Sequence, residues 1–179
     1  GLALANRVLA SRAFPIEVSI PSLTVLGTEV FEEFISRNEL APEDLPDDAI
    51  ARAFQRGDMP VRIVGDLRAL IEEVRTPLAI RSSALHEDAL EEPEAGAYLT
   101  KMIPNNQHDP DARFRKLVEA VKFVYASAYF KQAMDYRRAA GREAEEKMAV
   151  IVQEVVGSRH VDRFYPDLSG VARSYNIAH

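Results

Sequence analysis

One arginine follows directly after a short apolar run. Residues 77–80 read Pro-Leu-Ala-Ile, a pattern that predicts a buried strand, and Arg81 opens the polar, loop-like stretch after it. A guanidinium held rigidly there offers five donors in a fixed fork, which match phosphate oxygens better than a lysine ammonium does. The sequence therefore predicts a phosphate-binding role for Arg81, and it equally allows an ion pair with Glu87 or Asp88.

Other residues near Arg81 carry weaker signals. Ser82 and Ser83 can donate hydrogen bonds to phosphate oxygens, although serines at such positions more commonly cap helices or form turns. Gly96 lets a backbone approach a ligand closely, and it fits an ordinary turn as well. The acidic segment 86–96, which carries Pro93 and Gly96, predicts a mobile loop.

A second candidate site lies in the hydrophobic segment 148–156, which predicts a strand. Backbone groups beside Gln153 and Glu154 offer donors and acceptors for the edge of an adenine, while Val152 and Val155 offer apolar surface for its face. The alternative is an ordinary core strand with polar residues at its edges.

Several other chemistries find no support in the sequence. The four histidines lie in polar segments without metal-ligand spacing, so we expect no histidine metal site. Neither GxxxxGK[ST] nor GxGxxG occurs, which excludes a P-loop or Rossmann phosphate cradle. The paired glutamates, for example Glu72-Glu73, are typical of solvated helix faces.

Composition narrows the function further. The formal net charge of -6 and the lack of a basic block argue against nucleic acid as a partner. The absence of cysteine fits a reducing compartment, so we expect a cytoplasmic protein. No apolar run approaches the roughly 20 residues of a membrane span, and no membrane partner is expected.

The chain alternates helical patterns with a few short strands, which predicts an α+β fold with a small mixed or antiparallel sheet. Helices are expected over 2–12, 28–38, 47–54, 61–74, 110–125 and 129–141, and strands over 17–20, 23–26, 77–80, 97–102, 148–156 and 170–174. The first helix has no N-cap residue before it, so we expect the sequence to begin inside a longer protein.

Several segments resemble, in order, the ATP-binding domain of the phosphoenolpyruvate synthase and pyruvate phosphate dikinase family. They are Leu78-Ala79-Ile80-Arg81-Ser82-Ser83-Ala84, Glu87-Asp88, Ala95-Gly96, Val124-Tyr125-Ala126-Ser127, Tyr136-Arg137, residues 148–157 and residues 169–174. The resemblance lies in residues 77–179, whereas residues 1–76 fit only through their helical pattern. We therefore expect residues 1–179 to form a single, partial ATP-binding domain.

The resemblance implies an ATP-grasp-like portion, incomplete at both ends, in which ATP lies between two subdomains. The phosphoryl group would pass to a histidine on a separate swivelling domain and then to pyruvate or a similar acceptor. It implies a catalytic, phosphate-binding role for Arg81, supported by Ser82, Ser83, Gly96, Ala97 and Tyr98, and an adenine-binding role for Gln153, Glu154, Val155 and Val156. Catalysis would be electrostatic, because phosphoryl transfer needs alignment and charge neutralisation.

The sequence also departs from the family pattern. The phosphate-binding lysine would lie before Gly1, the acidic metal ligands would lie beyond His179, and no phosphohistidine motif is present. We therefore expect Mg²⁺ only in the complete domain, and we expect the 179-residue chain not to complete the reaction alone. The alternative is a non-catalytic nucleotide-sensing or interaction module that retains the fold.

Overall fold

A computed structural model describes residues 2–13, 15–42, 45–84, 98–139 and 147–171. The helices in these ranges are α1 (Leu2–Ser11), α2 (Thr28–Arg37), α3 (Asp47–Arg56), α4 (Val61–Glu73), α5 (Pro110–Ser127) and α6 (Lys131–Ala139). The strands are β1 (Leu23–Leu26), β2 (Leu78–Ala84), β3 (Thr100–Ile103), β4 (Met148–Glu154), β5 (Ser158–His160) and β6 (Arg163–Tyr165). The predicted α+β class is confirmed.

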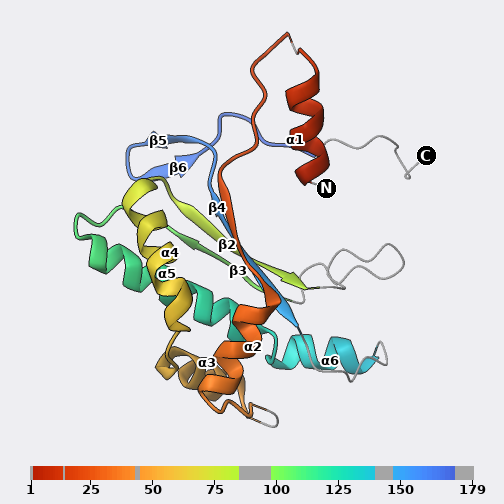
Figure 1. Cartoon of the computed structure of the whole chain (residues 1–179), viewed down its shortest axis with the longest axis vertical. Helices are drawn as coiled ribbons and strands as arrows, with labels where there is room; N and C mark the ends of the chain where they lie inside the picture. The colour runs from red at the N-terminus through yellow and green to blue at the C-terminus, as the bar shows by residue number, and fades with distance from the viewer. Residues whose placement is uncertain (1, 14, 43–44, 85–97, 140–146, 172–179) are drawn as a thin grey trace.

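The first four strands form one antiparallel sheet in the order β1-β4-β2-β3, and β5 and β6 form a separate hairpin (Figure 1). Strand β4 lies between β1 and β2 and pairs with both, and its continuous apolar run from Met148 to Val152 suits this central position. Its buried side chains are Met148, Val150 and Val152. The sheet is therefore antiparallel throughout, one of the two arrangements that the sequence left open.

A layer of helices covers the face of the sheet to which Val150 points. Helices α2 and α5 contact β4, α5 also contacts β2 and β3, and α3 and α4 pack on α5 (Figure 1). Aromatic rings fill this interface, with Phe34 lying 5.7 Å from both Phe54 and Tyr125 between ring centroids. Burial of these apolar side chains supplies the main driving force for the fold.

The opposite face of the sheet is the open face, defined by Leu23, Val25, Ala79, Arg81, Ser83, Thr100, Met102, Ala149, Ile151 and Gln153. Side chains in a strand alternate between the two faces, so the register alone assigns these residues. Val25 is 54% exposed and Met102 is 60% exposed. Within the described ranges, the open face has no helical layer comparable to that over Val150.

Two strand predictions need correction, and one hairpin was missed. Glu17–Ile20 is not a strand, because the edge position next to β4 is taken by Leu23–Leu26, as predicted. Residues 170 and 171 are not in a strand, and the rest of the predicted segment 170–174 lies outside the described residues. The hairpin formed by β5 and β6 was not predicted at all.

Candidate functional site

Arg81 lies within β2 rather than in a loop. The strand continues to Ala84 because residues 81–84 pair with β4, with Arg81 opposite Ile151, and Arg81 also pairs with Thr100 of β3. Its side chain is on the open face and is exposed. Among the residues that the structure describes, none forms an ion pair or a side-chain hydrogen bond with Arg81. The predicted partners Glu87 and Asp88 lie outside those residues.

The two serines after Arg81 point to opposite faces. Ser83 shares the open face with Arg81 and is half-buried, whereas Ser82 is only 6% exposed and belongs to the helix-covered face. The period of two along a strand dictates this division. The structure therefore places Ser83 on the same face as Arg81 and Ser82 on the opposite face.

The segment expected to cover the phosphates is described only from Tyr98 onward. Gly96 and Ala97 lie outside the described residues. Tyr98 is 5% exposed and packs in the hydrophobic core, and the backbone N–H of Leu99 donates to the Ser127 Oγ at 3.3 Å. This contact ties the start of β3 to the end of α5.

The end of β4 is fixed to both neighbouring segments. The backbone N–H of Glu154 donates to the Ser22 carbonyl at 3.0 Å, and that of Val155 donates to the Pro77 carbonyl at 2.9 Å. The Glu154 carboxylate accepts a 2.8 Å hydrogen bond from the Thr76 hydroxyl. Of the four residues expected to hold adenine, Gln153 lies on the open face and Val156 is 61% exposed. The Glu154 carboxylate and backbone N–H are already hydrogen-bonded to Thr76 and Ser22.

A cavity of about 830 Å³ opens at this end of the sheet, and we call it the hairpin pocket. Val155 and Met102 give it apolar surface, residues 75–77 form one wall, and residues 159–164 of the hairpin form another. The sequence analysis missed the hairpin wall. The sequence gives little signal for it, because the two residues between its strands, Val161 and Asp162, are not a typical hairpin-turn pair, although Val161 adopts a positive φ of 59°.

The hairpin pocket is lined by more positive than negative charge. Arg75, Arg159 and Arg163 line it, against the single carboxylate of Asp162. In a chain with a formal net charge of -6, this local group of guanidinium side chains can stack on an aromatic ring and donate hydrogen bonds to the acceptor atoms of a ligand. The sequence alone did not reveal it, because Arg75 lies more than 80 residues before the hairpin that carries Arg159 and Arg163.

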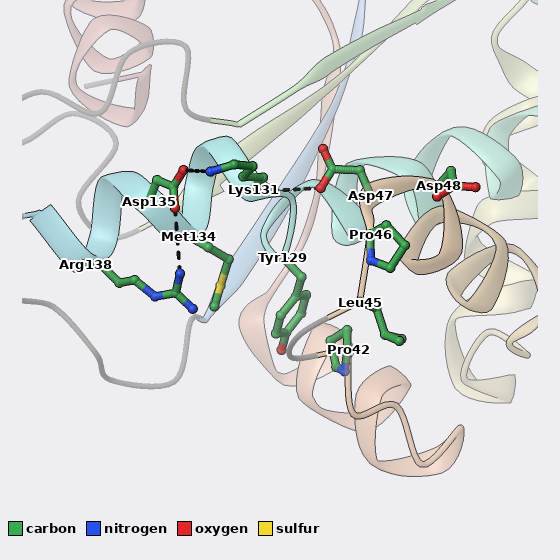
Figure 2. A pocket seen from close by; sticks show the side chains of 10 residues that line it. All are labelled: Pro42, Leu45, Pro46, Asp47, Asp48, Tyr129, Lys131, Met134, Asp135 and Arg138. Carbon is green, nitrogen blue, oxygen red and sulfur yellow. Dashed lines mark hydrogen bonds and ion pairs between the residues drawn. The ribbon is translucent and has the colours of Figure 1, made fainter.

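A second cavity of about 760 Å³ lies on the helical side, between the start of α3 and α6 (Figure 2). Asp47 caps α6 by accepting a 2.8 Å hydrogen bond from the Lys131 backbone N–H. The carboxylate of Asp135 pairs with Lys131 and lies 3.7 Å from the Arg138 guanidinium. Lys131 is the first cause of the lowered Asp135 pKa, through its hydrogen bond. These charges satisfy one another, so we assign the cavity a structural role.

In the ranges given above, no group of three or more histidine, aspartate or glutamate side chains is placed to hold a metal ion. The described helices also include none with the length and apolar character needed to span a bilayer.

Comparison with known proteins places the chain in a family. A search of curated proteins found no match. Among protein families, residues 7–179 match the one described as pyruvate phosphate dikinase, AMP/ATP-binding domain. This match spans nearly the whole sequence and agrees with the α+β architecture and the antiparallel sheet described above. The chain thus belongs to the pyruvate phosphate dikinase AMP/ATP-binding domain family, and it is an ATP-binding domain of that type.

Proposed function

We propose that this domain delivers ATP for phosphoryl transfer in a multidomain phosphotransferase of the phosphoenolpyruvate synthase and pyruvate phosphate dikinase type. In this proposal, a histidine on a swivelling domain receives the phosphoryl group and passes it to pyruvate or a similar acceptor. Mg²⁺ would be bound in the complete domain. The lack of cysteine supports a cytoplasmic setting for this reaction.

The position of Arg81 carries the proposal. Its guanidinium is exposed on the open face, and its backbone is held by pairing on both sides, with β3 and with β4. A fixed backbone with an exposed fork of donors suits bidentate binding of a phosphate group. In phosphoryl transfer such a cation stabilises the negative charge that spreads over the transferred group.

The hairpin pocket provides the place for the adenine. Val155 and Met102 offer apolar surface there. Gln153, two residues before Val155 in the chain, offers a polar side chain on the open face, and Val156 follows directly after Val155. Pro77 lines this pocket and lies four residues before Arg81 on the same chain. At the usual rise along a strand this is about 13 Å, a span that suits an extended nucleotide with its base at the pocket and its phosphates at Arg81.

Calorimetric titration of the 179-residue chain with ATP tests this arrangement. We expect Arg81→Ala to weaken ATP binding by roughly 10- to 100-fold, because a hydrogen bond to a charged group contributes about 1.5–3 kcal/mol. Arg56→Ala is the matched control, since Arg56 is an exposed arginine at the end of α3 on the helical side. It should leave the affinity unchanged.

The same titration separates the possible failures. Equal affinity of Arg81→Ala and the wild-type chain would remove Arg81 from the site. Binding of ATP without phosphoryl transfer in the full-length parent protein, assayed as labelled phosphohistidine, would favour the nucleotide-sensing alternative. Formation of phosphohistidine that Arg81→Ala abolishes would support the phosphotransferase.

A further inference from the structure

A buried arginine lies beneath the wall of the hairpin pocket. Arg113, in the first turns of α5, is 0% exposed. Its Nη1 donates to the carbonyls of Ile71 at 2.5 Å and Val74 at 3.1 Å, where α4 ends. The guanidinium therefore interacts with the negative end of the α4 helix dipole.

The charge of Arg113 is otherwise poorly compensated. Its Nε and Nη2 are buried and have no hydrogen-bond partner among the described residues. Burial and then the nearby Arg75 lower the pKa of Arg113. A buried cation held mainly by carbonyl groups is costly for stability. An apolar side chain would fill the same space at a lower cost in folding free energy. Stability alone therefore does not explain an arginine at position 113.

Asn105 connects Arg113 to the pocket wall. It is 2% exposed and adopts a positive φ of 50°, a conformation that asparagine tolerates better than most residues. Its Nδ2 donates to the carbonyls of Val74 at 2.9 Å and Thr76 at 3.0 Å, and its Oδ1 lies 3.5 Å from Arg113 Nη1. Asn105 thus fastens the segment after β3 to the segment before β2.

The network continues to the end of β4. Thr76 lines the hairpin pocket, and its hydroxyl donates to Glu154 at 2.8 Å. The next residue, Pro77, accepts from the Val155 backbone N–H at 2.9 Å. These hydrogen bonds connect three parts of the pocket wall to one another. The three parts are residues 75–77, the segment 102–106 and Val155.

We propose that Arg113 and Asn105 are positioning residues that preorganise the hairpin pocket for the adenosine part of the nucleotide. They do not reach the ligand; they act through Thr76 and the end of β4. The inference rests on the proposed function, and it adds that the two ends of the nucleotide are bound by separable parts of the domain. Preorganisation of this kind raises affinity by reducing the cost of ordering the site.

The test uses adenosine and inorganic tripolyphosphate as separate probes in calorimetric titrations of the full chain. Asn105→Gly keeps the positive φ accessible and removes the side chain together with its amide hydrogen bonds. We expect it to weaken adenosine binding about tenfold, which corresponds to the loss of buried hydrogen bonds, and to leave tripolyphosphate binding unchanged. Thr76→Val, which removes one hydroxyl at nearly constant shape, should weaken adenosine binding by a smaller factor.

Two comparisons separate positioning from stability. Ile50→Val lowers the stability of the core at α3, away from the network, and should leave both affinities unchanged. Arg81→Ala should show the reverse selectivity of Asn105→Gly, with tripolyphosphate binding lost and adenosine binding kept. Thermal unfolding of each variant shows that the titrations are made on folded protein.

Each result decides between the two proposals. If the wild-type chain binds neither probe, the nucleotide-site proposal fails and this inference fails with it. If the wild-type chain binds both and Asn105→Gly weakens both equally, or weakens neither, only the positioning role is overturned. A selective loss of adenosine affinity in Asn105→Gly and Thr76→Val supports it.

Discussion

The two faces of the central sheet differ in what covers them. The helix-covered face is filled by fully buried side chains such as Phe34, Ile80 and Val150, whereas the open face leaves Val25 and Met102 more than half exposed. Both faces belong to the same strands, so the difference arises from the helices and not from the sheet. We infer that the covered face determines stability and that the open face is available for ligand binding.

The largest difference in stability between the two faces is expected from replacing one side chain on each face by alanine. Phe34→Ala should lower the free energy of unfolding by about 3–5 kcal/mol, because Phe34 is 0% exposed and contacts two other rings. Met102→Ala on the open face should change it by less than about 0.5 kcal/mol. Urea unfolding followed by circular dichroism measures both. A large loss in Met102→Ala would show that the open face is packed in solution.

The position of α5 offers a smaller test. Asp109 caps this helix, with its carboxylate accepting from the backbone N–H of Asp111 at 3.1 Å and of Ala112 at 3.0 Å. Asp109→Ala should lower the free energy of unfolding by about 1 kcal/mol. Asp109→Asn keeps a capping side chain and should recover most of that loss. Equal losses in both variants would assign the effect to charge instead of capping.

Tyr125 is a place on the helix-covered face where a substitution is expected to leave stability unchanged or increase it. Its hydroxyl is buried and has no hydrogen-bond partner within the described part of the chain, and burial raises its pKa. Tyr125→Phe should leave the free energy of unfolding unchanged or raise it by up to about 1 kcal/mol, because an unsatisfied polar group is removed. A loss of more than about 1 kcal/mol, measured by the same urea titration, would mean that the hydroxyl has a partner.

The smallest expected effect is the pH dependence of stability that comes from an exposed ion pair on α5. The hydrogen bond from Arg68 to Asp111, 2.6 Å long, is the first cause of the lowered Asp111 pKa. A carboxyl group with a lowered pKa stabilises the fold above its unfolded pKa of about 4 and loses that contribution as the pH falls further. The difference in Tm between wild type and Asp111→Asn should therefore shrink below pH 4. A difference that is constant with pH would exclude this ion pair as its source.

The sequence predicted elements whose signals are local. The hydrophobic segment 148–156 and the apolar run that begins at Pro77 predicted β4 and β2, and the helical pattern over residues 110–125 predicted α5. Strand Glu17–Ile20 was predicted wrongly, because an apolar alternation does not reveal whether the sheet has a free edge to pair with.

The site was predicted less completely, for a related reason. The phosphate-binding role of Arg81 came from its type and position and stays a prediction. The sequence expected Arg81 to open a loop, but pairing with β4 lengthens β2 through Ala84 and so assigns Ser82 to the other face. The hairpin pocket joins residues from four separate stretches, and the Arg113–Asn105 contacts span loops of no distinctive composition. Such groupings depend on tertiary contacts that no local pattern encodes.

The pairing of β1 with β4 has a consequence for biosynthesis. Thr24 of β1 is opposite Val152, so the second strand that the first requires is made only after α2 to α6. At about 5–20 residues per second, a ribosome takes on the order of ten seconds to supply it. During that interval residues 23–26 have no β4 to pair with, and we expect this segment to be the part of the nascent sheet most exposed to pairing with other chains.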